Sequence, residues 1–223
     1  RTFKVDGRGL EVHVVKRPGL TRSTQIKAGG GVARGLQYWN SKYYAVVGDT
    51  LYENSTVKQV LATSTGECGF EKYEVGGVEY LFVCDGTDAY TITTAGVITQ
   101  VNQTYSAWAG TTNYSVGDRK IPTVTNGYYY EVTADAGSSA AGEPTWPTTI
   151  GTTVVDGGIT WTCSGTYGGF PSPHVPTPKH IDGYMFLPKA NTLDIYNSDV
   201  DNIYGWGGDF ISAEMWSDNV VGL

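Results

Sequence analysis

The chain has 223 residues, with 22 acidic against 15 basic side chains and a formal net charge of −7. Its longest cationic groupings are pairs such as Lys16-Arg17, which argues against a surface that binds nucleic acid through many phosphate contacts. Three cysteines without a CxxC spacing argue against a disulfide scaffold or zinc site, and no apolar run reaches the roughly 20 residues of a membrane helix.

The composition indicates a protein built from β-strands. Gly and Tyr are abundant, with 30 and 16 residues. Aromatic side chains pack well on sheets, and Gly adopts the positive φ of tight turns. No segment longer than about ten residues shows the 3.6-residue apolar period of a helix. We therefore expect an all-β fold with almost no helix. Because the chain begins with Arg and ends in NVVGL, we also expect either a processed piece or a fragment of a longer polypeptide.

Three segments share one pattern: KYYAVVGDTLYEN from Lys42, EYLFVCDGTDAYTI from Glu79 and GYMFLPKANTLDIYN from Gly183. Each predicts a β-hairpin, because residues of alternating character flank turn formers such as Gly48-Asp49 and Asp85-Gly86. The predicted correspondences are Tyr43, Tyr80 and Tyr184; Val46, Val83 and Leu187; and Tyr52, Tyr90 and Tyr196.

Further strands are predicted before the first two hairpins (GVARGLQYW and CGFEKYEV) and after them (VKQVLA and GVITQV). About four strands per unit is the composition of a propeller blade. Tyr43 and Tyr80 lie 37 residues apart, close to the period of such repeats. Three blades do not close a propeller, so we expect the missing strands from another part of the chain, a partner chain or a different closure.

The third hairpin is displaced, since 104 residues separate Tyr80 from Tyr184. The block between them is rich in Gly, Thr, Ser, Tyr and Trp and lacks the repeat pattern. We interpret it as an inserted domain, because loop closure becomes only slowly less favourable with length. The predicted organisation is a propeller-like β-domain in two parts, 1–104 and 166–223, interrupted by a small β-module at 105–165.

Motifs of catalysis or metal binding are weak throughout. KAGGGVARG from Lys27 lacks the GK[ST] ending of a phosphate loop, and we interpret it as a turn. NSDVDN from Asn197 has Asn202 where a calcium loop requires Gly, which favours a solvated acidic loop. His174 and His180 do not have a recognised ligand spacing. We expect no metal, no cofactor and no enzymatic activity.

The inserted block carries aromatic residues and turns in a definite order. Trp108 is followed by Tyr114 and Gly117-Asp118, and then by NGYYYEV, GEPTWP and VDGGITWTC. This order resembles small chitin- and cellulose-binding modules, and still more the short modules of bacteriophage tail proteins that end in an Asp-Gly-Gly-x-x-Trp strand. The resemblance implies carbohydrate recognition, in which aromatic rings stack on the apolar faces of sugars.

The same rings are needed to fill the thin core of so small a domain. We assign Trp108 and Trp161 to that core. In NGYYYEV, alternate residues face opposite sides, so Tyr128 and Tyr130 share one face and Tyr129 takes the other. The candidate carbohydrate-binding residues are Tyr114, Tyr129 and Trp146.

The segment NSDVDNIYGWGGDFISAEMWSDNVVGL from Asn197, together with VVKRPGL near the start, resembles the packaged-DNA stabilisation or tail-hub proteins of short-tailed bacteriophages. The resemblance implies a β-propeller-like structural virion protein that forms a ring below the portal and closes the DNA exit channel. Its expected partners are a portal-side adaptor, a needle or nozzle, and further copies of itself, with a hexamer favoured. It would assemble in the host cytoplasm, and DNA would pass an acidic lumen without specific binding.

Two other functions stay open at this stage. One is a tail protein for receptor recognition whose inserted module binds a host surface polysaccharide. The other is a glycan-degrading enzyme, which rests only on the frequent pairing of propeller folds with sugar-binding appendages.

Overall fold

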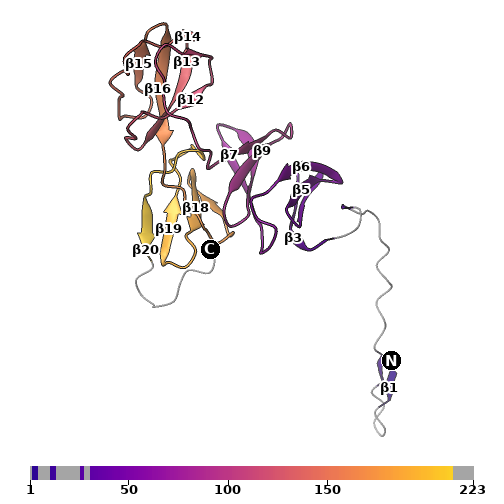
Figure 1. The fold of residues 1–223 in the computed structure, drawn as a ribbon. Helices are drawn as coiled ribbons and strands as arrows, with labels where there is room; N and C mark the ends of the chain where they lie inside the picture. Colours follow the sequence, from indigo (N-terminus) through magenta and orange to yellow (C-terminus); the bar gives the residue numbers. More distant parts are fainter. Residues whose placement is uncertain (1, 5–10, 14–25, 28–30, 213–223) are drawn as a thin grey trace.

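The computed structural model describes residues 2–4, 11–13, 26–27 and 31–212, and all regular elements among them are β-strands (Figure 1). The expected all-β class is confirmed for these residues. In this part of the chain no helix offers the length and apolarity to cross a bilayer. The first two strands, β1 (Thr2–Lys4) and β2 (Glu11–His13), pair with each other in antiparallel fashion.

Three four-stranded antiparallel sheets carry the three repeated hairpins, each with its strands adjacent in chain order. Sheet I consists of β3 (Ala33–Trp39), β4 (Lys42–Val47), β5 (Thr50–Glu53) and β6 (Thr56–Val60). Sheet II consists of β7 (Gly69–Val75), β8 (Val78–Cys84), β9 (Ala89–Thr93) and β10 (Ile98–Gln100). Sheet III consists of β17 (Lys179–Ile181), β18 (Tyr184–Pro188), β19 (Asp194–Asn197) and β20 (Phe210–Ser212).

The three sheets form a row in which sheet II is covered on both faces. One apolar layer, with Val46 and Leu51 from sheet I and Leu81 and Ile92 from sheet II, lies between the first two sheets. A second layer lies between sheets II and III and includes Phe82, Cys84, Met185 and Leu187. The first strand of sheet II, β7, contacts the first strands of both neighbours, β3 and β17. The described part of the chain contains no closed ring of sheets.

The predicted correspondences hold between sheets II and III. In sheet I, Tyr52 faces the same way as Tyr90 and Tyr196, but Tyr43 and Val46 face the opposite way from their predicted counterparts. Val83 pairs with Tyr90, and Leu187 with Tyr196, each facing the preceding sheet. Val46 instead pairs with Leu51 and faces the following sheet. The reason is the spacing between the two matched residues. Tyr52 follows Val46 by six residues, whereas Tyr90 follows Val83 by seven. Val83 and Tyr90 therefore pair on one face, while Val46 and Tyr52 lie on opposite faces.

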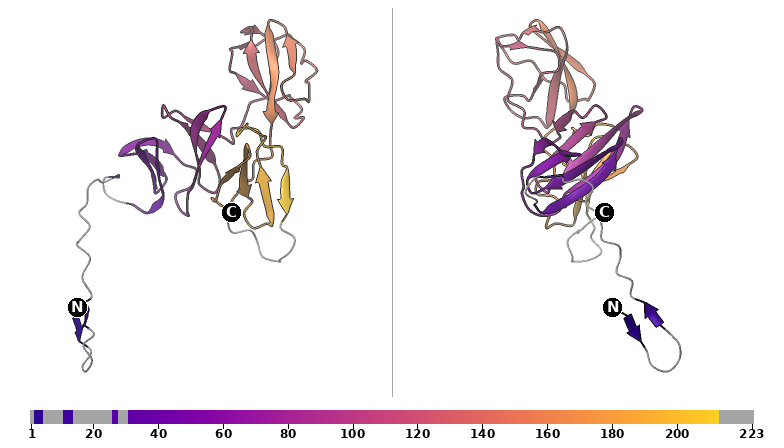
Figure 2. Two further views of the ribbon diagram at one scale, coloured as in Figure 1. Left: turned by 180° about the vertical axis from the view of Figure 1, so that it is seen from behind. Right: turned by 90° about the vertical axis from the view of Figure 1, so that its right-hand side faces the viewer.

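The residues between sheets II and III form a β-structure of their own. Its larger sheet contains, in spatial order, β12 (Arg119–Lys120), β13 (Tyr128–Ala134), β16 (Ile159–Thr166) and β15 (Thr153–Asp156). A smaller sheet pairs β11 (Asn113–Tyr114) with β14 (Gly137–Ser138). The core of this structure, here called the module, includes Trp108, Trp161 and Cys163. The module stands over sheet III and away from sheet I (Figure 2).

All three cysteines are free and buried. Cys68 lies in the layer between sheets I and II, Cys84 in the layer between sheets II and III, and Cys163 in the core of the module. Burial raises the pKa of the Cys68 thiol to about 11. These thiols pack as small apolar side chains.

Candidate functional site

The three candidate carbohydrate-binding residues do not share a surface. Tyr114 is 6% exposed and Tyr129 is 2% exposed, while Trp146 is half-buried. Tyr114 and Trp146 pack against the same core, with ring centroids 5.0 and 5.7 Å from that of Trp161. Tyr129 lies on the other face of β13, as the alternation of NGYYYEV predicted. In this conformation neither tyrosine offers a free ring face for a sugar. Carbohydrate binding at these residues stays a prediction, and Trp146 is the best placed of the three for it.

A buried carboxylate organises the module around its tryptophans. Asp156 is 2% exposed, and its Oδ2 accepts hydrogen bonds from the indole Nε1 of Trp108 at 2.8 Å and of Trp161 at 3.0 Å. Its Oδ1 accepts the backbone N–H of Ala140 at 2.8 Å. The assignment of both tryptophans to the core is confirmed, and the acidic residue of VDGG, which reads in the sequence as a turn residue, is their shared acceptor. The turn itself is also present, with Gly157 at φ +63° between β15 and β16.

The loop that carries Trp146 is fixed by its neighbours. Pro147 O accepts a hydrogen bond from the Tyr130 hydroxyl at 2.7 Å, and the Tyr130 and Trp146 rings lie 4.3 Å apart. The Trp146 indole donates to Glu143 at 2.8 Å, and Glu143 also accepts from Thr123. Burial opposes the charge of Glu143, but the hydrogen bonds from Thr123 and Trp146 lower its pKa.

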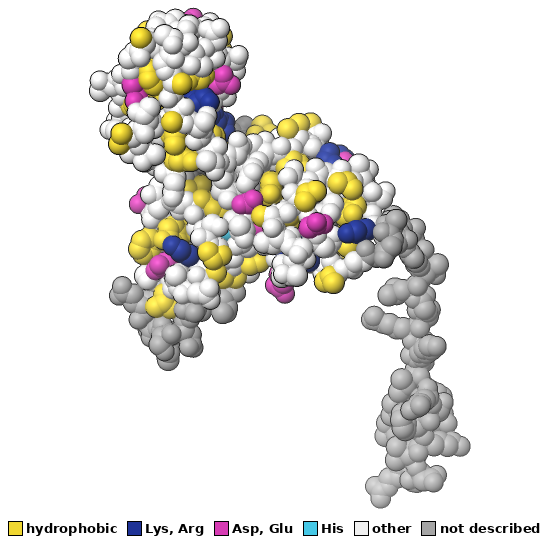
Figure 3. Space-filling model, in the orientation of Figure 1, with side chains coloured by type: hydrophobic (Ala, Val, Ile, Leu, Met, Phe, Trp, Pro, Cys, Tyr) yellow, Lys and Arg dark blue, Asp and Glu magenta, His cyan; other side chains and the backbone are white. Residues whose placement is uncertain are grey.

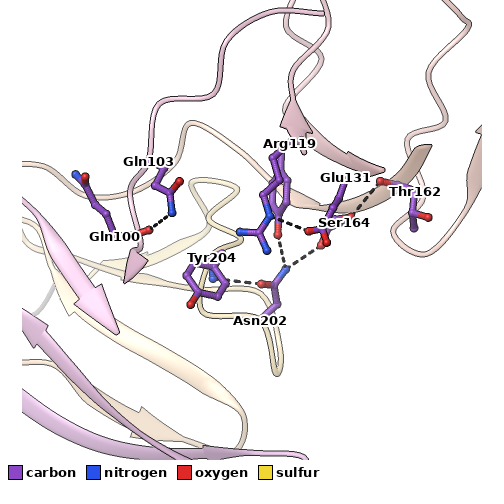
Figure 4. Close-up of polar contacts among 9 residues, drawn as sticks. Gln100, Gln103, Arg119, Glu131, Thr162, Ser164, Asn202 and Tyr204 are labelled. Atoms are coloured by element: carbon purple, nitrogen blue, oxygen red, sulfur yellow. Dashed lines mark hydrogen bonds and ion pairs between the residues drawn. The ribbon is translucent and has the colours of Figure 1, made fainter. Parts of the chain in front are cut away.

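The outer face of β13 joins the module to sheet III (Figure 4). Arg119 Nε donates to Glu131 at 2.7 Å, and the guanidinium lies over the rings of Tyr129 at 5.6 Å and Tyr204 at 5.2 Å. Tyr204 belongs to the loop between β19 and β20, and its hydroxyl is 2.8 Å from Thr91 Oγ1 of sheet II. Burial raises the pKa of Tyr129 to about 12, although Asn202 and Arg119 act against this. Tyr204 therefore contacts the module while it bonds to sheet II.

The acidic loop from Asn197 fastens the end of β16. Asp199 accepts the backbone N–H and the hydroxyl of Thr166, both at 2.9 Å. Asn202 Nδ2 donates to Ser164 O at 3.0 Å, at a β-bulge where the register between β13 and β16 shifts. Gly205 leaves room for this arrangement, since a Cβ there would lie 2.0 Å from Asp199 Oδ2. The expectation of a solvated loop is wrong for Asp199, because a partner 33 residues away replaces water.

A small cleft lies beside this joint. Its volume is about 190 Å³, and its lining includes Tyr105, Tyr167, Phe170, Tyr204 and Trp206. Ligand pockets in proteins usually measure about 300–1,000 Å³. The volume and the aromatic walls suit packing between two parts of the chain better than the enclosure of a substrate.

Polar side chains also connect the sheets of the row. Arg34 is 6% exposed and donates to the carbonyls of Gly48, Thr63 and Gly66 at 2.6–2.9 Å. Thr63 in turn donates its backbone N–H to Asp85 Oδ2 at 2.9 Å, in the loop between β8 and β9. Arg34 therefore ties sheet I to the segment that leads into sheet II.

His174 connects the loop between β8 and β9 of sheet II to the segment that leads into sheet III. It is 3% exposed, its Nε2 accepts the N–H of Gly86 at 3.2 Å, and its Nδ1 lies 3.1 Å from Pro171 O. This geometry fits the neutral tautomer with the proton on Nδ1, which donates to Pro171 O. Burial lowers the pKa of His174. The sequence showed this residue only as one of two histidines among prolines.

Among the described residues, no group of three or more His, Cys, Asp or Glu side chains could hold a metal ion. No protein-family model matches the chain, and no curated protein matches it either.

Proposed function

We propose that the protein is a structural component of a bacteriophage virion, a tail-hub or head-completion protein that helps to close the DNA exit channel. In this proposal the three sheets are propeller-like blades of an array that assembly completes. The protein has no enzymatic activity and needs no cofactor. Its partners are a portal-side adaptor, a needle or nozzle and further copies of the chain, six being favoured, and it assembles in the host cytoplasm.

The contact of β7 with both β3 and β17 supports this proposal best. In a propeller, blades surround a common channel, so the strands nearest the channel belong to neighbouring blades. In the row, the strands in contact are the first strands of three successive sheets. The close approach of β3 and β7 is visible at Gly35, where an added Cβ would lie 2.6 Å from the Phe70 ring.

The open ends of the row give a second argument. A sheet face that no other layer covers is rarely left apolar in a monomeric protein. Within the described part of the chain, sheets I and III each have such a face, and a structural protein of an assembly would have it covered by neighbours. The net charge of −7 suits a wall that repels passing DNA.

The sequence resemblance to tail-hub proteins lies partly outside the described residues. VVKRPGL and the last residues, from 213 on, belong to that part. Within the described part, residues 197–208 of the resemblance fasten β16 of the module through Asp199 and Asn202.

Purified virus particles that encode this sequence would test the proposal. The expected result is the protein in a fixed copy number per particle, with antibodies against it labelling the tail vertex. Particles assembled without it are expected to lose their DNA. Presence of the protein in lysed cells but not in particles would contradict the proposal.

An alternative is that the module recognises a polysaccharide of the host surface. The half-buried Trp146, held in a loop between Pro144 and Pro147, is the observation that favours it. Binding of the intact protein to host polysaccharide, lost in Trp146→Ala and kept in Val155→Ala, would support this alternative. Equal binding by both variants would exclude Trp146 from such a site.

A further inference from the structure

Among the described residues, no further layer covers the outer faces of sheets I and III, and both faces carry exposed apolar side chains. On sheet I, the face turned away from sheet II is defined by the paired residues Tyr38 and Tyr43 and by the series Leu36, Ala45, Tyr52 and Val57. Five of its side chains are more than half exposed: Leu36, Tyr38, Tyr43, Val57 and Val60. The described ladder residues on this face include no charged side chain.

Sheet III has its open face on the other side of the row. Met185 and Leu187 face sheet II, so the residues between them in the alternation face outward. Ile195 and Ile211 are paired on that face, as are Ile181 and Tyr184. Ile181 and Ile211 are more than half exposed. Hydrophobic side chains reach the surface over both end sheets in Figure 3.

We propose that these two faces bind each other between two copies of the chain, with sheet I of each copy packed on sheet III of the other. We call the face of a sheet that is turned toward the next sheet along the chain its forward face, and the opposite face its backward face. In both buried layers, the forward face of one sheet packs on the backward face of the next. The open face of sheet III is a forward face and that of sheet I a backward face. The two ends are therefore of complementary kinds, and their contact continues the stacking already present within the chain.

The number of sheets per chain favours an assembly of two copies over other copy numbers. Each copy contributes three four-stranded sheets to the row. Rings of such sheets close with about four to eight members. Two copies give a ring inside this range, whereas one copy or three copies do not. The module is attached to the loop between β19 and β20, where Asp199 and Asn202 bond to it. It therefore leaves the outer faces of sheets I and III free for this contact.

This inference concerns how the row closes and goes beyond the proposed virion role, on which it does not depend. A hexameric assembly of the chain would then consist of three such pairs. If the protein proves to be no part of a virion, the pairing of the two faces is unaffected.

Native mass spectrometry and light scattering of the full chain test the pairing directly. We expect a species of twice the 24.0 kDa chain mass. Tyr43→Glu on sheet I and Ile211→Glu on sheet III should each weaken the pair roughly tenfold or more, because a charge would be buried in an apolar contact. Both side chains are more than half exposed, so the variants should fold, which circular dichroism verifies. Val155→Glu is the matched control on the exposed surface of the module and should leave the pair intact.

Mixing the two variants gives the decisive result. In a mixed pair, the sheet III face of the Tyr43→Glu copy meets the sheet I face of the Ile211→Glu copy, so one of the two contacts is intact. A mixed pair should therefore form, more weakly than the wild type, when neither variant pairs alone. A monomeric wild type at all concentrations, a pair that survives either substitution, or a mixture that remains monomeric would overturn the inference. A face-to-same-face dimer would also be recognised, since Ile211→Glu would not affect a contact between two sheet I faces.

Discussion

The module and the row of sheets hold their aromatic side chains by different means. In the module, the indoles of Trp108 and Trp161 converge on the single carboxylate of Asp156. In the row, Trp39 and Trp206 lie in apolar layers shared between sheets, and the polar connections lie at the loops. The buried polar contacts of the module therefore converge on one residue, whereas those of the row are spread over several loops.

The largest effect is expected where the stabilisation is most concentrated. Asp156→Ala leaves two indole N–H groups and one backbone N–H buried without an acceptor, and each such group costs about 1–3 kcal/mol. We expect the module to lose about 4 kcal/mol of unfolding free energy. Hydrogen exchange measured by mass spectrometry should show β13 and β16 exchanging rapidly while sheets I and II stay protected.

Val155→Ala is the control, because this neighbouring side chain on β15 is 71% exposed. Its exchange should match that of the wild type. Equal loss of protection in the module and in sheets I and II of Asp156→Ala would show that the two regions unfold as one, against the comparison drawn above.

The row should tolerate loss of a polar connection better. Arg34→Met keeps much of the apolar stem but removes hydrogen bonds to Gly48, Thr63 and Gly66. Because the apolar layer between sheets I and II remains, we expect a loss of about 2 kcal/mol. Denaturant unfolding measures this change. A loss larger than that of Asp156→Ala would show that the row also depends on one residue.

The joint between the two regions should respond more weakly still. Asn202→Ala removes the hydrogen bond to Ser164 O and the one that Asn202 Oδ1 accepts from the Tyr204 N–H, but leaves Asp199 bonded to Thr166. We expect about 1 kcal/mol, seen as faster hydrogen exchange near Thr166 with no change in the cores. Unfolding of the module in this variant would mean that sheet III is required for its fold.

The smallest effect concerns pH. The pKa of His174 is lowered below its ordinary value of 6.5 by burial. As the pH falls through 6.5, His174 takes up a proton in the unfolded chain but not yet in the folded chain. The free energy of unfolding therefore decreases as the pH falls below about 6.5. The slope should not exceed about 1.4 kcal/mol per pH unit.

His174→Gln tests this assignment, since glutamine carries both a donor and an acceptor but does not titrate near neutrality. Unfolding measured between pH 7.5 and 5.5 should depend less on pH in the variant than in the wild type. An unchanged dependence would assign the effect to groups other than His174.

Much of the local structure follows from the sequence, because strands and turns are determined by neighbouring residues. The alternation in NGYYYEV predicted the two faces of β13, and Gly48-Asp49 predicted the turn between β4 and β5. The equivalence of Val46 with Val83 failed because the spacing to the matched tyrosine differs by one residue, which moves Val46 to the other face of its hairpin, and an alignment by residue type does not show this.

The candidate site depended on contacts between distant residues. A ring such as Tyr129 reads equally well as a sugar platform or as packing, and only the approach of Tyr105 and Arg119 from other segments buries it. Asp156 likewise reads as a turn residue until Trp108, 48 residues away, reaches it.

By itself, the sequence determined the all-β class, the repeated hairpins and the aromatic core of the module, since strand alternation and turn chemistry act over a few residues. Tertiary structure alone decided which faces are covered. The layers on sheet II, the burial of Asp156 and the open ends of the row arise from segments far apart in the chain, whose approach no local pattern encodes.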